Sequence, residues 1–106
     1  KGNEPEVKEP ESLRTAPNDA GVYRVFVSDT EGNMVKGAAV QFCSDSTCMM
    51  AKTDENGVAS FKADEGQIYT IHMLKVPSGY EKNNEEFKTE TVYCDIYISL
   101  QKADSN

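Results

Sequence analysis

The sequence has no long hydrophobic run and few basic side chains, and each lack excludes a class of protein. A membrane-spanning helix needs about 18 consecutive apolar residues, and no stretch approaches that length, so no transmembrane segment is expected in this chain. Acidic residues outnumber basic ones by 18 to 11, and the net charge is −7. Because phosphate backbones repel such a surface, nucleic acid is excluded as an expected partner.

Motifs of catalysis and cofactor binding are also missing. The sequence contains no glycine-rich phosphate loop, no serine nucleophile elbow and no HExxH zinc motif. His72 and the three cysteines have the atom types of a zinc site, but strand alternation predicts His72 and Cys94 on opposite sheet faces. No third group that would orient a Cys–His nucleophile pair can be recognised. No enzyme activity, catalytic residue, cofactor or metal site is therefore expected.

Two acidic turns, at 29–33 and 54–57, place oxygen atoms on loops that could attract calcium. Neither turn has the ligand spacing of an EF-hand. Aspartate and asparagine in such turns commonly accept hydrogen bonds from the local backbone. Ordinary turns are therefore the preferred interpretation of both segments.

The chain is rich in short segments in which apolar and polar residues alternate, separated by clusters of turn residues. This period of two is typical of half-buried strands, and no segment has a sustained helical period. The core-facing sets are predicted to be Tyr23, Val25 and Val27 near the start and every second residue from Val92 to Leu100 near the end. About seven such strands with glycine-marked turns predict an all-β fold, a seven-stranded antiparallel β-sandwich with Ig-like Greek-key architecture.

Composition divides the chain into three parts. Residues 1–19 are polar, carry three of the four prolines and are expected to form a flexible leader or linker. The β-sandwich domain is expected over 20–102, followed by a polar tail over 103–106. A polar start without an initiator methionine is typical of a protein whose export signal or lipoprotein leader has been removed, and a piece of a larger protein would look the same. The expected location is extracellular.

The spacing of the cysteines supports this location. Cys43 and Cys48 enclose a polar loop of the length that connects two antiparallel strands, so a disulfide between them is predicted. Closing so short a loop removes little entropy from the unfolded chain, so the bond is expected to stiffen a hairpin. Cys94 is left over and is expected to be a small buried apolar side chain.

Several pieces of the sequence, in order, resemble one known family. They are DTEG at 29–32 followed by VKGAAV at 35–40, TDENGVASF at 53–61, and YTI at 69–71 followed by PSGY at 77–80. Over residues 22–100 the chain resembles the prealbumin-like β-sandwich modules of bacterial surface proteins, close to collagen-adhesin B-type repeats and carboxypeptidase-regulatory-like domains. The resemblance implies that Tyr80 packs back against the edge of the sandwich.

Many modules of this kind carry an isopeptide bond, in which a lysine of the first strand joins an asparagine or aspartate of the last strand beside a glutamate. Counting back from the family's turns places Val27 at the lysine position and Met73 at the glutamate position. The inward residues Cys94 and Ile96 of the last strand cannot form such an amide. We therefore expect a module without an isopeptide bond.

The topology of the resembled family places the first and last strands side by side. Phe26, Tyr93 and Tyr97 would then point outward on one sheet and form an aromatic strip, a candidate surface for binding a partner, a glycan or another copy. Alternatively, the N-terminal segment lies across these rings with Val7 and Leu13, or the rings are exposed singly.

These expectations describe a non-catalytic extracellular module of a bacterial surface protein or small lipoprotein, located at the cell surface, with a lipid anchor as one option. It would serve as an adhesion or spacer domain, and its candidate partners are the cell wall, a host protein or a glycan. One alternative is an accessory domain that binds carbohydrate or a small ligand at the aromatic strip. Another is an accessory domain of a processing enzyme.

Overall fold

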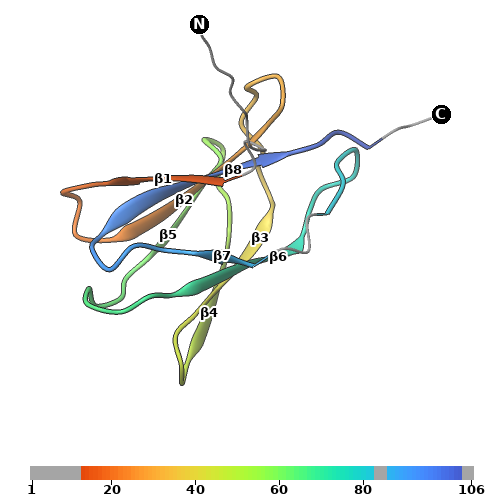
Figure 1. The fold of residues 1–106 in the computed structure, drawn as a ribbon. Coiled ribbons are helices and arrows are strands. Elements are labelled where there is room, and N and C mark those ends of the chain that lie inside the picture. The colour runs from red at the N-terminus through yellow and green to blue at the C-terminus, as the bar shows by residue number, and fades with distance from the viewer. Residues whose placement is uncertain (1–12, 83–85, 104–106) are drawn as a thin grey trace, which may run out of the picture.

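The computed structural model describes residues 13–82 and 86–103, which form two packed sheets of strands and no helix (Figure 1). The strands are β1 Leu13–Pro17, β2 Tyr23–Asp29, β3 Ala39–Cys43, β4 Cys48–Lys52, β5 Val58–Phe61, β6 Thr70–Lys75, β7 Phe87–Lys88 and β8 Cys94–Leu100. The first sheet has the order β1-β8-β2-β5, and the second has the order β4-β3-β6-β7. The predicted all-β sandwich is confirmed, and the described residues form eight strands in place of the seven predicted. The described residues include no helix that is long and apolar enough to span a membrane.

One pair of neighbouring strands runs parallel, whereas the other pairs are antiparallel. This pair is β2 and β8, in register from Arg24 opposite Asp95 to Asp29 opposite Leu100. The first long strand and the last strand therefore lie side by side in the middle of the first sheet, as the resemblance implies. This pairing brings residues from distant parts of the chain onto one sheet face.

The alternation along β2 decides which of its side chains enter the core. Tyr23, Val25 and Val27 are fully buried, as predicted, whereas Arg24 and Phe26 between them are half-buried on the outer face. The apolar side chains of β8 from Cys94 to Leu100 face the same interior. Removing this apolar surface from water stabilises the sandwich by about 25 cal/mol per Å².

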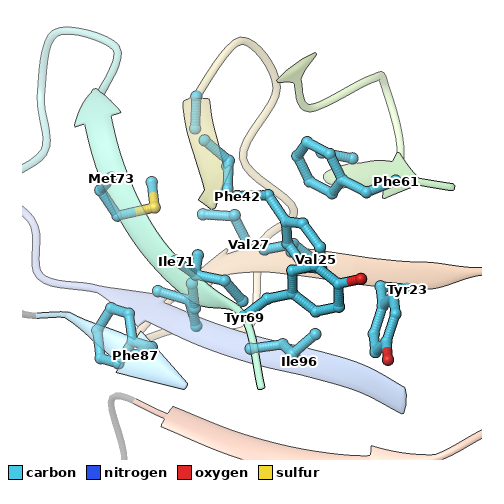
Figure 2. Packing of buried hydrophobic residues seen from close by; sticks show 14 of the residues in the cluster. Tyr23, Val25, Val27, Phe42, Phe61, Tyr69, Ile71, Met73, Phe87 and Ile96 are labelled. Carbon is cyan, nitrogen blue, oxygen red and sulfur yellow. The ribbon is translucent and has the colours of Figure 1, made fainter. Parts of the chain in front are cut away.

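Aromatic rings form the middle of the interface between the two sheets (Figure 2). Phe42 of β3 stacks on Phe61 and on Tyr69, with ring centroids 4.7 Å apart in each pair. Tyr23 of β2 lies 5.3 Å from Phe42 and packs against Tyr69 at 5.2 Å. Since Phe61 belongs to the first sheet, the Phe42 ring joins one sheet to the other.

The turn that ends at Gly57 is fastened to β2. The Asp54 carboxylate accepts hydrogen bonds from the backbone N–H groups of Asn56 at 2.8 Å and Val58 at 3.1 Å. The Val27 N–H donates to the Gly57 carbonyl at 2.8 Å. Gly57 has φ of 75°, and a Cβ atom added to it would lie 2.6 Å from the Val27 carbonyl oxygen. Glycine is therefore required here both by the backbone conformation and by the close approach of β2.

β1 is a strand that the sequence does not predict. Leu13–Pro17 lie within the stretch 1–19 that composition assigns to a linker, so the linker prediction is wrong for these five residues. A proline is tolerated in β1 because an edge strand leaves the hydrogen-bonding groups of one side unpaired. The other predicted domain boundaries stay predictions, and Val7 lies outside the described residues.

Candidate functional site on the outer face of the first sheet

The pairing of β1, β8 and β2 lines up three long side chains across the outer face of the first sheet. Arg14 of β1 pairs with Tyr97 of β8, and Tyr97 pairs with Phe26 of β2. Since paired residues of neighbouring strands point to the same face, all three side chains project away from the core. We call Arg14, Tyr97 and Phe26 the aromatic row, because the Arg14 guanidinium lies over one of the two aromatic rings of the set.

The members of the aromatic row cover one another. The Phe26 and Tyr97 rings are stacked, with centroids 5.0 Å apart and planes inclined by 21°. The guanidinium carbon of Arg14 lies over the Tyr97 ring, 4.5 Å from its centroid. Because β1 and β2 flank β8 on opposite sides, Arg14 and Phe26 contact opposite faces of Tyr97. A ligand that stacks on Tyr97 must first displace Arg14 or Phe26.

Beside the aromatic row lies a bidentate ion pair between β2 and β8. Arg24 Nε donates to Asp95 Oδ1 at 2.7 Å, and Arg24 Nη2 donates to Oδ2 at 3.0 Å. The Asn18 side-chain amide donates a third hydrogen bond to Oδ1 at 2.7 Å. Asp95 is 8% exposed although it belongs to the outward-facing set of its strand, because these two residues cover it. The Arg24 guanidinium also lies 5.5 Å from the Phe26 ring centroid, which connects the ion pair to the aromatic row.

Replacing Arg24 with alanine should lower the free energy of unfolding by about 2 kcal/mol. The nearly buried Asp95 carboxylate would keep only the Asn18 amide as its side-chain donor. Urea unfolding followed by circular dichroism measures the change. Ser60, the exposed β5 partner of Arg24, provides the control, and Ser60→Ala should change stability by less than about 0.5 kcal/mol. Equal stabilities of the two variants would show that the ion pair contributes nothing.

The structure does not bring Tyr93 into the strip predicted with Phe26 and Tyr97. The Tyr93 ring packs against Tyr23 at the margin of the core, with centroids 5.1 Å apart. The Tyr93 N–H donates to the Glu65 carboxylate at 2.8 Å. The proposed binding role of Phe26, Tyr93 and Tyr97 stays a prediction, with Phe26 and Tyr97 adjacent and Tyr93 apart from them.

The different position of Tyr93 follows from where β8 begins. The strand starts at Cys94, so its alternation does not extend to the two preceding residues. Val92, which the sequence predicts to face the core, is 44% exposed, whereas Tyr93 is half-buried. At these two residues the predicted order of buried and exposed side chains is therefore reversed.

The predicted disulfide is present. Cys43 and Cys48 are paired in register at the end of the β3–β4 hairpin and are bonded to each other. Cys94 is a free, buried cysteine, as predicted. Burial raises the pKa of the Cys94 thiol, and a buried thiol that stays protonated is a poor nucleophile.

The side chains that the sequence offers as zinc ligands lie in different parts of the sandwich. His72 Nε2 lies 3.2 Å from a Glu86 carboxylate oxygen on the second sheet, whereas Cys94 lies inside the sandwich on the first. Among the described residues, no three histidine, cysteine, aspartate or glutamate side chains gather as a set that could hold a metal ion.

The Asp29 carboxylate, in one of the two acidic turns, accepts hydrogen bonds from its own turn and from Tyr80. Oδ1 accepts hydrogen bonds at 2.9 Å from the backbone N–H groups of Glu31 and Asn33, and Oδ2 accepts one at 3.1 Å from the Tyr80 hydroxyl. Burial alone would raise the pKa of the Asp29 carboxyl, but the hydrogen bonds outweigh burial and hold its pKa below the ordinary value. Tyr80 packs against the core as the resemblance implies.

The two positions that the resemblance assigns to a lysine and a glutamate lie in the interior. Val27 is fully buried and Met73 is 2% exposed. Figure 2 shows both among apolar side chains of the core. On β8, the residue in register with Val27 is Ile98, which is also buried.

Sequence reasoning missed the residues that make most of the outer-face contacts. Arg24 and Asp95 have a usable signal, because opposite charges occupy outward positions of two strands that the resemblance places side by side. Arg14 and Asn18 have none, since the sequence does not predict β1. Their role depends on a strand pairing that local pattern does not encode.

The architecture defines a class of β-sandwich domain in which the first long strand and the last strand pair in parallel. The Bacillus anthracis TIE protein matches it with a TM-score of 0.72 and 16% identity, over 77% of this chain and 16% of that chain. The C-terminal fragment of the pilus adhesin SpaC from Lactobacillus rhamnosus GG matches with a TM-score of 0.67 and 14% identity, over 80% of this chain and 46% of that chain. The open conformation of the same adhesin matches with a TM-score of 0.64 and 16% identity, over 80% of this chain and 15% of that chain. No protein-family model and no curated protein matches the chain.

The chain spans less than half of the SpaC fragment and a much smaller share of the TIE protein. At these identities the likeness shows a shared fold. Since one fold hosts many functions, the function has to be argued from the residues themselves.

Proposed function

We propose that this chain is a non-catalytic, extracellular module of a bacterial surface protein, where it serves as a spacer or adhesion domain. Its fold is similar to domains of a pilus adhesin, and it spans a part of the chains that it matches, as one module of a larger protein would. The disulfide between Cys43 and Cys48 fits an oxidising compartment. Attachment through a lipid, and partners in the cell wall, a host protein or a glycan, belong to the same proposal.

The observation that carries the isopeptide-free part of the proposal is the uncharged interior at Val27 and Met73. A prealbumin-like adhesin module with an isopeptide bond needs a lysine and a glutamate there, and either charge left alone in this core would cost several kcal/mol. Here apolar packing takes the place of both, and Val27 faces Ile98 on the neighbouring strand. The module is therefore proposed to be held together by packing and to have no isopeptide bond and no reactive centre.

The intact protein, measured after reduction and denaturation, should have the mass calculated from its sequence. An isopeptide bond expels one molecule of ammonia or water, so a deficit of either size would contradict this part of the proposal. Reduction beforehand removes the mass difference that the Cys43–Cys48 disulfide contributes. A peptide map then shows whether any deficit lies in a peptide that joins β2 to β8.

The location is tested on cells that produce the natural full-length protein. A membrane-impermeant label should mark the module on intact cells, and the unreduced module should have one free thiol, that of Cys94. Cells lysed before labelling provide the control for reactivity. No labelling of intact cells, together with three free thiols in the module, would place it in a reducing compartment and overturn the proposal.

Binding of carbohydrate or a small ligand stays the alternative function. A shallow hollow of about 240 Å³ beside the aromatic row is lined by Arg14, Ser28, Tyr97, Ile98 and Ser99. The covered faces of Tyr97 and the separate position of Tyr93 give this alternative less support than the spacer or adhesion role.

A further inference from the structure

β1 reverses the direction in which the chain enters the first sheet. It runs antiparallel to β8, with Leu13 opposite Ile98 and Pro17 opposite Cys94. The chain therefore enters β1 at the same end of the sheet at which β8 leaves it (Figure 1). Without β1, the chain would enter through β2, which runs parallel to β8, and would start at the opposite end.

β1 is held by β8 and by a few side chains. It lies at the edge of the sheet, where β8 is its one strand neighbour among residues 13–82 and 86–103. The Arg14 guanidinium lies on the Tyr97 ring, and the Thr15 hydroxyl donates to the Glu90 carboxylate at 3.2 Å. Arg14 and Pro17 are exposed to solvent. β2, by contrast, pairs with a strand on each side and places three fully buried side chains in the core.

The turn after β1 adds a final point of attachment. The Asn18 backbone N–H donates to the Tyr93 carbonyl at 3.0 Å, and the Asn18 side-chain amide donates to the Asp95 carboxylate. The chain then passes through Gly21, with φ of 76°, into β2. Releasing the whole segment from Leu13 to Val22 therefore requires the β1–β8 ladder and the Asn18 contacts to break.

We propose that β1 is a strap that peels from β8 under tension while the rest of the sandwich stays folded. When the two ends of the chain are pulled apart, the load falls in series on the Leu13–Ile98 end of the ladder and on residues 101–103. Two backbone hydrogen bonds of 2.9 Å hold those residues, one from the Glu81 N–H to the Gln101 carbonyl and one from the Ala103 N–H to the Gly79 carbonyl. The β1–β8 hydrogen bonds then break one after another, because the two strands separate from one end like a zipper. Each bond is loaded alone, so this step needs little force.

The parallel pair β2 and β8 resists the next step. Once β1 and residues 101–103 are released, the load enters at Tyr23 and leaves at Leu100, at opposite ends of two directly paired strands. Their hydrogen bonds are then loaded together in shear, and Val25 and Val27 must leave the core at the same time. The same topology that makes β1 easy to peel makes the β2–β8 pair hard to separate.

Peeling lengthens the module and uncovers two features of its surface. The residues from Leu13 to Val22 become extended, and the attachment point moves along the length of β8, so the ends separate by about 50 Å. Arg14 leaves one face of the Tyr97 ring, and the backbone edge of β8 becomes free. The strap deepens the proposed function, because a surface-anchored module under load can use both the lengthening of the chain and the uncovered Tyr97 ring and β8 edge. The peeling itself depends only on the order of the strands.

Single-molecule force spectroscopy on the full chain, with handles at its two ends, tests the strap. A first lengthening of about 50 Å should occur at lower force than the main unfolding step, and it should reverse when the force is lowered. Arg14→Ala should lower the force of the first step and leave the main step unchanged. Val25→Ala, within β2, should lower the force of the main step and leave the first unchanged. Unfolding of the parent chain in one step, or a shift of both steps by Arg14→Ala, would overturn the proposal.

Cys94 allows the peeling segment to be identified with one substitution. The Asn18 N–H donates to the Tyr93 carbonyl, so the alternation of the antiparallel ladder makes the next pair, Pro17 and Cys94, a non-hydrogen-bonded one. The Cα atoms of such a pair lie about 4.5 Å apart, within the range that a disulfide spans. In Pro17→Cys oxidised with oxidised glutathione, only the residues ahead of the bond can peel, so the first step should shorten to about 30 Å. The main step should vanish, because the new bond passes the load from β1 directly into β8, and β2 is no longer pulled.

Reduction should restore both steps of Pro17→Cys. Pro17→Ser and the parent chain, each measured with and without reductant, separate this effect from opening of the Cys43–Cys48 disulfide. A first step of unchanged length in the oxidised variant, with the bond verified by mass, would show that another segment is released first. Surface labelling and thiol counts report on location independently, so a failed location test leaves the peeling result intact, and a failed peeling test leaves the location intact.

Discussion

Replacing Phe42 with alanine should lower the free energy of unfolding by about 3–5 kcal/mol, because it removes the ring on which the two sheets meet. Phe42 is fully buried, and its ring lies within stacking distance of Phe61, Tyr69 and Tyr23. The cavity cannot be filled by a small shift of one sheet, since the surrounding rings come from both sheets. Chemical unfolding, followed by tyrosine fluorescence and by circular dichroism, measures the loss.

An exposed residue of similar hydrophobicity provides the control for Phe42→Ala. Ile68 is 53% exposed, and Ile68→Ala should change the free energy of unfolding by less than about 1 kcal/mol. If Phe42→Ala lost no more stability than Ile68→Ala, the aromatic cluster would not be the centre of the core.

Gly57→Ala should lower the free energy of unfolding by about 3 kcal/mol, from two causes that act together. The φ of 75° is unfavourable for any residue with a Cβ atom, and that atom would lie 2.6 Å from the Val27 carbonyl oxygen. Since the colliding atom belongs to the backbone of β2, no side-chain rotation relieves the contact. Either the turn or β2 must move, and the hydrogen bond from the Val27 N–H to the Gly57 carbonyl is then lost.

A substitution at Gly32 separates the cost of the positive φ from the cost of the close backbone contact. It has a similar φ of 87°, but nothing lies within 4 Å of a Cβ atom added there. Gly32→Ala should therefore cost only the conformational part, about 1 kcal/mol. Equal losses at Gly57 and Gly32 would show that close packing of the turn on β2 has no energetic consequence.

The chain's local patterns predicted most of the sandwich. Alternation identified Tyr23, Val25 and Val27 as core residues, and all three are buried. Two cysteines at hairpin spacing predicted the disulfide that is found. These predictions succeed because the face on which a side chain lies, and the conformation that a turn needs, depend on neighbouring residues along the chain.

The predictions that did not hold depend on where strands begin and what lies next to them. Extending the alternation beyond Cys94, where the strand starts, predicts Val92 in the core, but Val92 is 44% exposed. Asp95 fits the outward pattern of β8, yet it is nearly buried, because Arg24 and Asn18 close over it. The alternation of polar and apolar residues along one strand does not show which residues of other segments will lie beside it.

Local patterns along the chain predict the class of fold, the inward face of β2, the hairpin disulfide and the apolar residues at Val27 and Met73. Strand pairing in three dimensions makes a polar, proline-containing segment into β1, places Arg14 over Tyr97, and brings the start of β1 beside the end of β8. The physical reason is that side-chain period is a property of a single strand, whereas an edge strand is chosen by the unpaired backbone groups that its neighbour offers. β8 offers such an edge, and the sequence of β1 needs little hydrophobicity to occupy it.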